Sequence, residues 1–136
     1  MKFERLPFAT IDHLRPITQG HQEVVFSPGK TVGQVVAIAE RLEAAGGSFL
    51  ATRVDAAQAA ALAARFPRAE LNEIGRIVYL PPDPEPAPTG RGTVLVCTAG
   101  TSDLAVAEEA AVSARAFRNR VERLTDVGVE IGRAHV

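Results

Sequence analysis

A proline-rich segment near the middle of the chain places the strongest limit on how these 136 residues can fold. Residues 81–90 read PPDPEPAPTG, with five prolines and no apolar periodicity. Because proline fixes φ and has no backbone N–H to donate, this segment is predicted to be neither a helix nor a central strand. We therefore expect a semi-rigid connector between an N-terminal domain, residues 1–80, and the start of a second domain, residues 91–129.

Strand and helix signals alternate in the N-terminal domain. Short apolar runs predict strands at 23–27, 49–53 and 76–80. Thr31 with Gln34 matches a capping box for a first helix that ends at Gly46-Gly47, and Asp55 is predicted to cap a second helix that Pro67 stops. The expected apolar faces of these helices are Val35, Ile38, Ala39 and Leu42, then Ala59, Leu62 and Phe66. This order predicts a small α/β domain of the βαβαβ type with a parallel sheet.

The second domain begins with the same alternation. Residues 93–97, TVLVC, form a nearly continuous apolar run, which predicts a parallel strand buried on both faces, with Cys97 as a small core residue. A helix is expected from 104 to about 118, followed by a strand within 121–129. The predicted apolar face of that helix consists of Val106, Ala110, Ala114, Phe117 and Val121. Together these elements predict one β–α–β unit, the start of a doubly wound parallel sheet.

Composition excludes several classes of function. With 15 basic and 16 acidic residues the chain has no polycationic surface for nucleic acid, and with no Trp and one Tyr it offers few base-stacking platforms. No apolar run approaches the length of a membrane span, and the N-terminus lacks a secretory apolar region. A single cysteine excludes an internal disulfide and fits a reducing compartment, so a cytoplasmic protein is expected.

The segment 11–31 is richer in polar residues than a core requires, and a solvated extended arm is its simplest interpretation. The spacing of His13 and His21 does not suit a metal site. SPGKT at 27–31 resembles part of a phosphate-binding P-loop, but Val24 stands where that motif needs glycine. Lys30 could still meet an anion at the start of the helix.

The turn TAGTSD, residues 98–103, joins the strand at 93–97 to the next helix. In open α/β sheets ligands bind at this position, where a glycine permits close approach and free helix N–H groups favour an anion. Two interpretations stay open: a ligand-binding turn, or a plain helix cap in which Ser102 or Asp103 serves only the backbone. Glu108 and Glu109 are expected to be solvated carboxylates that complement the helix dipole.

Four segments together resemble the LarB family of nickel-pincer cofactor biosynthesis. They are the early stretch IDHLR…QGHQEVVFSPGKT, then GQVVAIAERL, then LATR, and above all TAGTSDLAVAEEAA…VERLTDVGV. This family joins an N-terminal domain of its own to a domain like aminoimidazole ribonucleotide carboxylase (PurE) of purine synthesis. The resemblance covers residues 8 to 129 and implies a flavodoxin-like, doubly wound second domain.

The resemblance also implies a reaction. LarB-type enzymes carboxylate the pyridinium ring of nicotinic acid adenine dinucleotide with CO2 or bicarbonate as co-substrate, and they hydrolyse its phosphoanhydride to release AMP. A cysteine thiolate adduct activates the ring, and Mg2+ assists the phosphoanhydride step. The implied partners are this nucleotide substrate and, at full length, further copies of the chain in a homo-oligomer.

Site residues follow from the same resemblance. The expected substrate-binding residues are Thr98, Gly100, Thr101, Ser102 and Asp103, joined by Asp126 and Gly128 at the end of the next strand. Cys97 is not the implied nucleophile, because the family's catalytic cysteine lies beyond residue 129. Asn119 stands where the family usually carries a glycine, so it is expected to provide the left-handed helix cap.

The last seven residues, EIGRAHV at 130–136, depart from the family, which continues with a small-residue turn and a His-Arg pair. They resemble the translation of a common DNA sequencing adapter and are expected to be non-native. A chain ending this way would be an inactive fragment of the LarB-type enzyme. Two alternatives stay open: a PurE-type aminoimidazole ribonucleotide carboxylase, or a non-catalytic nucleotide-binding module in which residues 1–129 alone bind the ligand.

Overall fold

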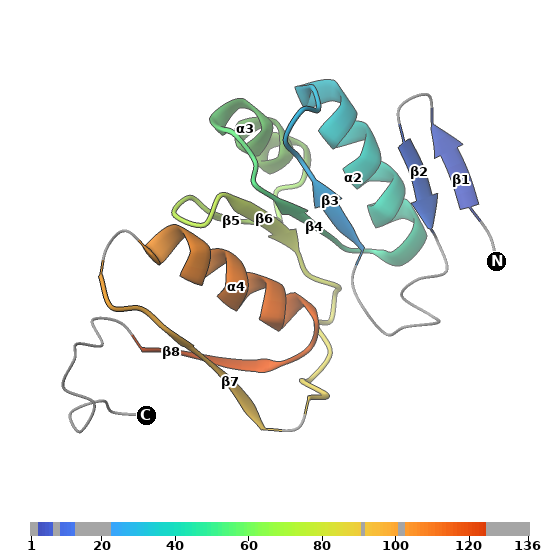
Figure 1. Ribbon diagram of the computed structural model, residues 1–136. Coiled ribbons are helices and arrows are strands. Elements are labelled where there is room, and N and C mark those ends of the chain that lie inside the picture. Colours follow the sequence, from blue (N-terminus) through green and yellow to red (C-terminus); the bar gives the residue numbers. More distant parts are fainter. Residues whose placement is uncertain (1–2, 7–8, 13–22, 91, 101–102, 125–136) are drawn as a thin grey trace, which may run out of the picture.

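The computed structural model describes residues 3–6, 9–12, 23–90, 92–100 and 103–124 (Figure 1). The strands are β1 (Phe3–Leu6), β2 (Ala9–Asp12), β3 (Val24–Phe26), β4 (Phe49–Thr52), β5 (Glu70–Asn72), β6 (Ile77–Leu80), β7 (Thr93–Cys97) and β8 (Arg120–Leu124). The helices are α2 (Val32–Gly46), α3 (Ala56–Arg65) and α4 (Leu104–Ala116). The fold class is α/β, as the sequence predicts.

The central sheet has the strand order β3-β4-β6-β5 and is mixed rather than parallel. β3 runs parallel to β4, while β6 is antiparallel to both β4 and β5. The expected parallel sheet is therefore wrong at β6. The chain returns through α3 so that β5 runs in the same direction as β4. The short turn at 73–76 then reverses the chain into β6, because a turn of this length can join only antiparallel strands. The sequence pattern misses β5 because Glu70–Asn72 is short and mostly polar.

The two helices of the N-terminal region begin and end as predicted. Thr31 and Asp55 each form a complete capping box, with Gln34 and Gln58 respectively. Gly47 adopts the left-handed conformation that ends α2, at φ 77°. Both helices pack on one face of the central sheet, where Phe49 meets Phe66 edge to face at 4.9 Å. Burial of this apolar face is the main stabilising term for the N-terminal region.

Helix α4 covers the other face of the central sheet and separates it from the β7–β8 pair (Figure 1). Leu50, Ile77 and Tyr79 form a second core on this face with Ala116 and the partly buried Val112. The predicted apolar face of α4 is wrong, since Val106 is 70% exposed and Ala110 is also exposed. The residues buried instead are Ala107, Ala111 and Ala116. An alanine-rich helix is apolar on several faces, so its neighbours decide which face is buried.

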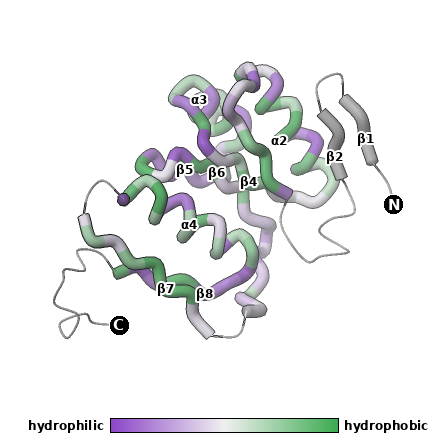
Figure 2. The backbone as a smooth tube through the Cα atoms, in the orientation of Figure 1, coloured by the Kyte–Doolittle hydropathy of each residue, from purple (hydrophilic) through white to green (hydrophobic). Residues whose placement is uncertain are grey.

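Strands β7 and β8 pair in parallel, from Thr93 opposite Arg120 to Cys97 opposite Leu124. The predicted β–α–β unit is therefore present. The predicted burial of the first strand is wrong, because Val94 and Leu95 stay exposed although β7 is strongly hydrophobic (Figure 2). Cys97 is exposed as well and is not a core residue. In the described part of the chain one helix and one strand neighbour β7, too few to cover both of its faces.

The proline-rich segment is anchored to the end of α4. The backbone N–H groups of Thr89 and Gly90 donate to the carbonyl oxygen of Arg118 at 2.9 and 3.2 Å. Arg118, at φ 66°, is the left-handed residue here, so the prediction for Asn119 is wrong. The Asn119 side chain instead donates from Nδ2 to the carbonyl oxygen of Ala114 at 3.0 Å and closes the helix end in that way. The domain boundary at residue 81 stays a prediction.

Strands β1 and β2 form an antiparallel hairpin beside α2 (Figure 1). The first residues of the predicted polar arm, 11 and 12, therefore belong to β2, while residues 13–22 lie outside the described part. None of the helices that the structure describes is long and apolar enough to cross a bilayer.

Candidate functional site

The turn after β7 presents two polar side chains with unused hydrogen-bonding capacity. The first is Thr98, whose backbone N–H extends the β7–β8 ladder by donating to the Leu124 carbonyl oxygen at 2.9 Å. Its side chain is only 5% exposed, and its hydroxyl oxygen has no hydrogen-bond partner in the described structure. A buried hydroxyl without a partner is costly, so this group is free to serve a ligand.

The second is Asp103, which precedes the first residue of α4. Its carboxylate is exposed and makes no capping hydrogen bond, so the interpretation of Asp103 as a plain cap is wrong. Gly100 lies between the two residues, and a Cβ there would meet no atom within 4 Å. Of the other predicted site residues, Thr101, Ser102, Asp126 and Gly128 lie outside the described residues.

Thr98→Val is expected to raise the free energy of unfolding by about 1 kcal/mol, because valine keeps the shape and removes the unpartnered hydroxyl. Urea unfolding of the two proteins, followed by circular dichroism, measures the difference. A loss of stability would instead indicate that the hydroxyl has a structural partner, and would remove Thr98 from the candidate site.

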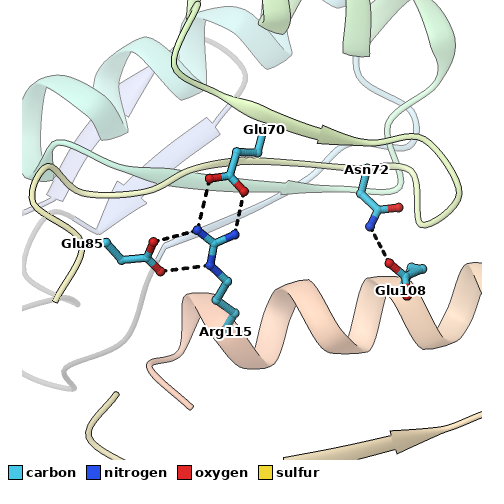
Figure 3. Close-up of polar contacts among 5 residues, drawn as sticks. All are labelled: Glu70, Asn72, Glu85, Glu108 and Arg115. Carbon is cyan, nitrogen blue, oxygen red and sulfur yellow. Dashed lines mark hydrogen bonds and ion pairs between the residues drawn. The ribbon is translucent and has the colours of Figure 1, made fainter. Parts of the chain in front are cut away.

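The N-terminal region holds the first half of α4 through the β5–β6 turn (Figure 3). Asn72 Nδ2 donates to Glu108 Oε1 at 2.8 Å, and Arg123 Nε donates to Glu108 Oε2 at the same distance. The hydrogen bond from Arg123 is the main reason that the pKa of Glu108 lies below its usual value. Gly75 packs directly on the backbone of Glu108 and Glu109. The expectation that Glu108 is solvated is therefore wrong, because its side chain is only 19% exposed and connects α4 to β5 and β8.

The second half of α4 is held by Arg115, which binds two carboxylates at once (Figure 3). Its guanidinium donates to Glu70 at 2.6 and 3.1 Å and to Glu85 at 2.7 and 3.0 Å. It also lies over the Tyr79 ring, 5.2 Å from the centroid. The Arg115 hydrogen bond lowers the pKa of Glu70, while burial, followed by the charge of Glu85, raises the pKa of Tyr79 to about 12.

The lowered pKa values of Glu70 and Glu108 predict how the free energy of unfolding depends on pH. Glu70 and Glu108 have folded-state pKa values below the usual 4.5, so their stabilising effect is complete above that pH and is lost as the pH falls through the lowered values. Urea unfolding between about pH 7 and pH 3 should show this loss, and Glu70→Gln should reduce it by less than about 1 kcal/mol, because the pair is half exposed. An unchanged slope for Glu70→Gln would contradict the role of this pair.

The residues that sequence reasoning misses, Asn72, Gly75 and Arg115, make contacts across 30 to 45 residues of sequence. A local signal exists only for the turn, since Asn72 and Gly75 are residue types that are common in turns. The Gly75 N–H indeed donates to Asn72 Oδ1 at 2.8 Å. Lys30, a predicted anion contact, donates instead to the carbonyl oxygen of Phe26 at 2.6 Å. Among the described side chains no group of three or more His, Cys, Asp or Glu could hold a metal ion.

Residues 3–82 match the family model described as the LarB/PurE-like N-terminal domain. The match spans β1 to β6 and ends inside the proline-rich segment, and it covers more than half of the chain. A comparison with curated proteins found no match.

Proposed function

We propose a function from one premise: the chain belongs to the family defined by the LarB/PurE-like N-terminal domain. We infer that the protein is a LarB-type enzyme. It carboxylates the pyridinium ring of nicotinic acid adenine dinucleotide and hydrolyses the phosphoanhydride, which releases AMP. The nucleophilic cysteine of this chemistry has no counterpart in residues 1–129, so these residues are proposed to supply substrate binding and not the covalent step.

The observation that carries this proposal inside the structure is the polar turn at the carboxyl end of β7. A buried hydroxyl at Thr98, an exposed carboxylate at Asp103 that makes no capping hydrogen bond, and open space at Gly100 lie within one short segment of the described residues. This position at a strand end, before a helix, is where α/β sheets bind nucleotides. The Asp103 carboxylate can accept hydrogen bonds from the ribose hydroxyls of such a substrate, and the Thr98 hydroxyl can donate to a phosphate oxygen or to the ring carboxylate.

The proposed carboxylation passes through a covalent adduct between a thiolate and the pyridinium ring. A thiolate bonds to a ring carbon and converts the pyridinium into a neutral dihydropyridine, whose neighbouring carbon then bonds to CO2. That carbon loses its proton and the thiolate leaves, which restores the aromatic pyridinium with one more carboxylate. In the second reaction water bonds to phosphorus and the P–O–P bridge breaks. The role of Thr98 and Asp103 in both reactions is to hold the substrate in one orientation.

Mg2+ is part of the proposal. It takes few protein carboxylates and keeps several waters, so the single exposed carboxylate of Asp103 fits an ion that the substrate phosphates mainly carry. When bound, Mg2+ would neutralise charge on the phosphoanhydride. A cytoplasmic location and assembly into a homo-oligomer belong to the same proposal.

A chimera tests the function. Residues 1–124 replace the matching region of a LarB-family enzyme that retains its own downstream cysteine, and AMP release is followed by chromatography with nicotinic acid adenine dinucleotide, Mg2+ and bicarbonate. We expect AMP and a carboxylated mononucleotide. A folded chimera that turns over aminoimidazole ribonucleotide instead supports the PurE alternative. Tight dinucleotide binding by residues 1–136 without turnover by the chimera supports the non-catalytic alternative.

A further inference from the structure

The carboxyl ends of the parallel strands β3 and β4 form a second polar surface, on the N-terminal domain. Because parallel strands end at the same edge of a sheet, Phe26 at the end of β3 and Arg53 after β4 come together. Cζ of Arg53 lies 6.0 Å from the centroid of the Phe26 ring. We call Phe26 and Arg53 the Phe26–Arg53 surface.

The guanidinium of Arg53 makes few polar contacts with the described residues. Among the described residues, its one ion pair joins Nε to Glu109 Oε2 at 3.6 Å, which is too long for a hydrogen bond, and the side chain is 54% exposed. The ion pairs of Arg65, Arg115 and Arg123 are all hydrogen-bonded, at 2.6 to 2.8 Å. Arg53 therefore keeps its donors available for an anion, and a guanidinium suits phosphate in particular.

The backbone at Arg53 costs free energy that an ordinary loop would avoid. Arg53 has φ 54°, and Arg76, in the turn just before the neighbouring strand β6, has φ 52°. The Val54 N–H donates to the Arg76 carbonyl oxygen at 2.9 Å, which places the two arginines side by side along the backbone. Glycine or asparagine would adopt these angles more easily, so the side chains at these positions need an explanation beyond folding.

Phe26 supplies a flat apolar face beside this cation. It lies on β3, an edge strand of the central sheet, and is 55% exposed. An exposed aromatic ring next to an arginine can stack a nucleobase while the arginine binds a phosphate. The chemistry of the surface thus matches a nucleoside monophosphate better than a simple inorganic anion.

The position of the surface connects it to the turn after β7. Glu109, which faces Arg53, lies six residues after Asp103 along α4. At 1.5 Å per residue this separates the two by roughly 9 Å along the helix axis. A dinucleotide that reaches the turn with one half can therefore reach Arg53 with the other.

We propose that the Phe26–Arg53 surface of the N-terminal domain binds the AMP half of the dinucleotide substrate. Arg53 holds its phosphate and Phe26 stacks the adenine. This inference rests on the proposed function, because it assigns the part of the substrate that the reaction releases. Glu109 competes with the phosphate for Arg53 and is displaced when AMP binds.

The test uses the full chain, residues 1–136, isotope-labelled for NMR and titrated with AMP, adenosine and inorganic pyrophosphate. We expect saturable AMP binding with a Kd of about 1 mM, the affinity of a small and open contact. Arg53→Gly should weaken AMP and pyrophosphate binding about tenfold. Phe26→Ala should weaken AMP and adenosine binding but not pyrophosphate binding. Glu109→Gln should strengthen AMP binding.

Arg65→Gln is the matched control, because Arg65 also lies over a phenylalanine ring and pairs with a glutamate. Unlike Arg53, it forms a short hydrogen bond of 2.7 Å to that glutamate. This variant should leave AMP binding unchanged. Arg53→Gly should unfold at no lower temperature than the parent chain, since φ 54° suits glycine. The inference is overturned if AMP does not bind, or if Arg53→Gly and Arg65→Gln have equal effects.

The chimera separates this inference from the function. An active chimera in which Arg53→Gly leaves the KM for the dinucleotide unchanged overturns the inference and leaves the function standing. An inactive chimera, with AMP still bound at Arg53 in the full chain, rejects the function and leaves the inference standing.

Discussion

Asp103→Ala in the chimera is expected to lower kcat/KM for AMP release about a hundredfold while the free energy of unfolding stays unchanged. A hydrogen bond to a charged group contributes about 1.5–3 kcal/mol, and a hundredfold change corresponds to about 2.7 kcal/mol. The expectation of unchanged stability has a structural reason: the carboxylate is exposed and makes no capping hydrogen bond to α4. Steady-state kinetics and urea unfolding of the same preparations measure both quantities.

Two further variants sharpen this prediction. Asp103→Asn keeps one acceptor oxygen and should recover part of the lost rate. Because asparagine also caps helices well, the unchanged stability of both variants, and not this recovery, separates substrate binding from a capping role. Glu122→Ala removes an exposed carboxylate from β8 and serves as the control, with no expected change in rate. If Asp103→Ala lowers stability and rate together, the residue acts on the fold and the proposed binding role is wrong.

Gly75→Ala is expected to destabilise the chain by about 1–3 kcal/mol, the usual cost of overpacking. An added Cβ would lie 2.9 Å from the Glu109 nitrogen, 3.0 Å from the Glu108 Cβ and 3.1 Å from the Glu108 carbonyl carbon. Two of these atoms belong to the helix backbone and cannot rotate away, so α4 and the β5–β6 turn must separate. Urea unfolding followed by circular dichroism gives the difference.

Gly46→Ala is the matched control for this substitution. Gly46 is the last residue of α2, and a Cβ there meets no atom within 4 Å. Alanine in a helix is more favourable than glycine by about 0.5–1 kcal/mol, so this variant should be as stable as the parent chain or more stable. Equal stability of Gly75→Ala and the parent chain would show that the close contact between α4 and the N-terminal domain does not contribute to folding.

Local signals predict the helices of this protein well. Thr31 with Gln34 and Asp55 with Gln58 form their hydrogen bonds within four residues, and Gly47 ends α2 through its own backbone conformation. The strands β3, β4, β6 and β7 follow from short apolar runs, and β8 follows from a loose alternation of apolar residues, for a similar reason. The candidate turn is recognisable because a glycine and polar residues interrupt an apolar strand just before a helix.

Long-range packing decides what these signals leave open. Whether β6 pairs in parallel depends on a hairpin with the short strand β5, which no apolar run marks. Which face of α4 is buried depends on two sheets that lie on either side of it, since alanines occur around the whole helix. Whether Cys97 is buried depends on which elements pack against β7 and not on the sequence of β7, and Cys97 is exposed here.

The sequence by itself determined the three helices, the caps of α2 and α3, the strands β3, β4, β6, β7 and β8, and the turn that follows β7, because these depend on residues a few positions apart. Its resemblance to the LarB family agrees with the match over residues 3–82. Only the tertiary structure decided that Asn72, Gly75 and Arg115 hold α4 against the N-terminal region, and that Arg53 lies beside Phe26 with a long ion pair to Glu109. Those contacts join residues far apart in the chain, and their geometry exists only after both faces of the central sheet are covered.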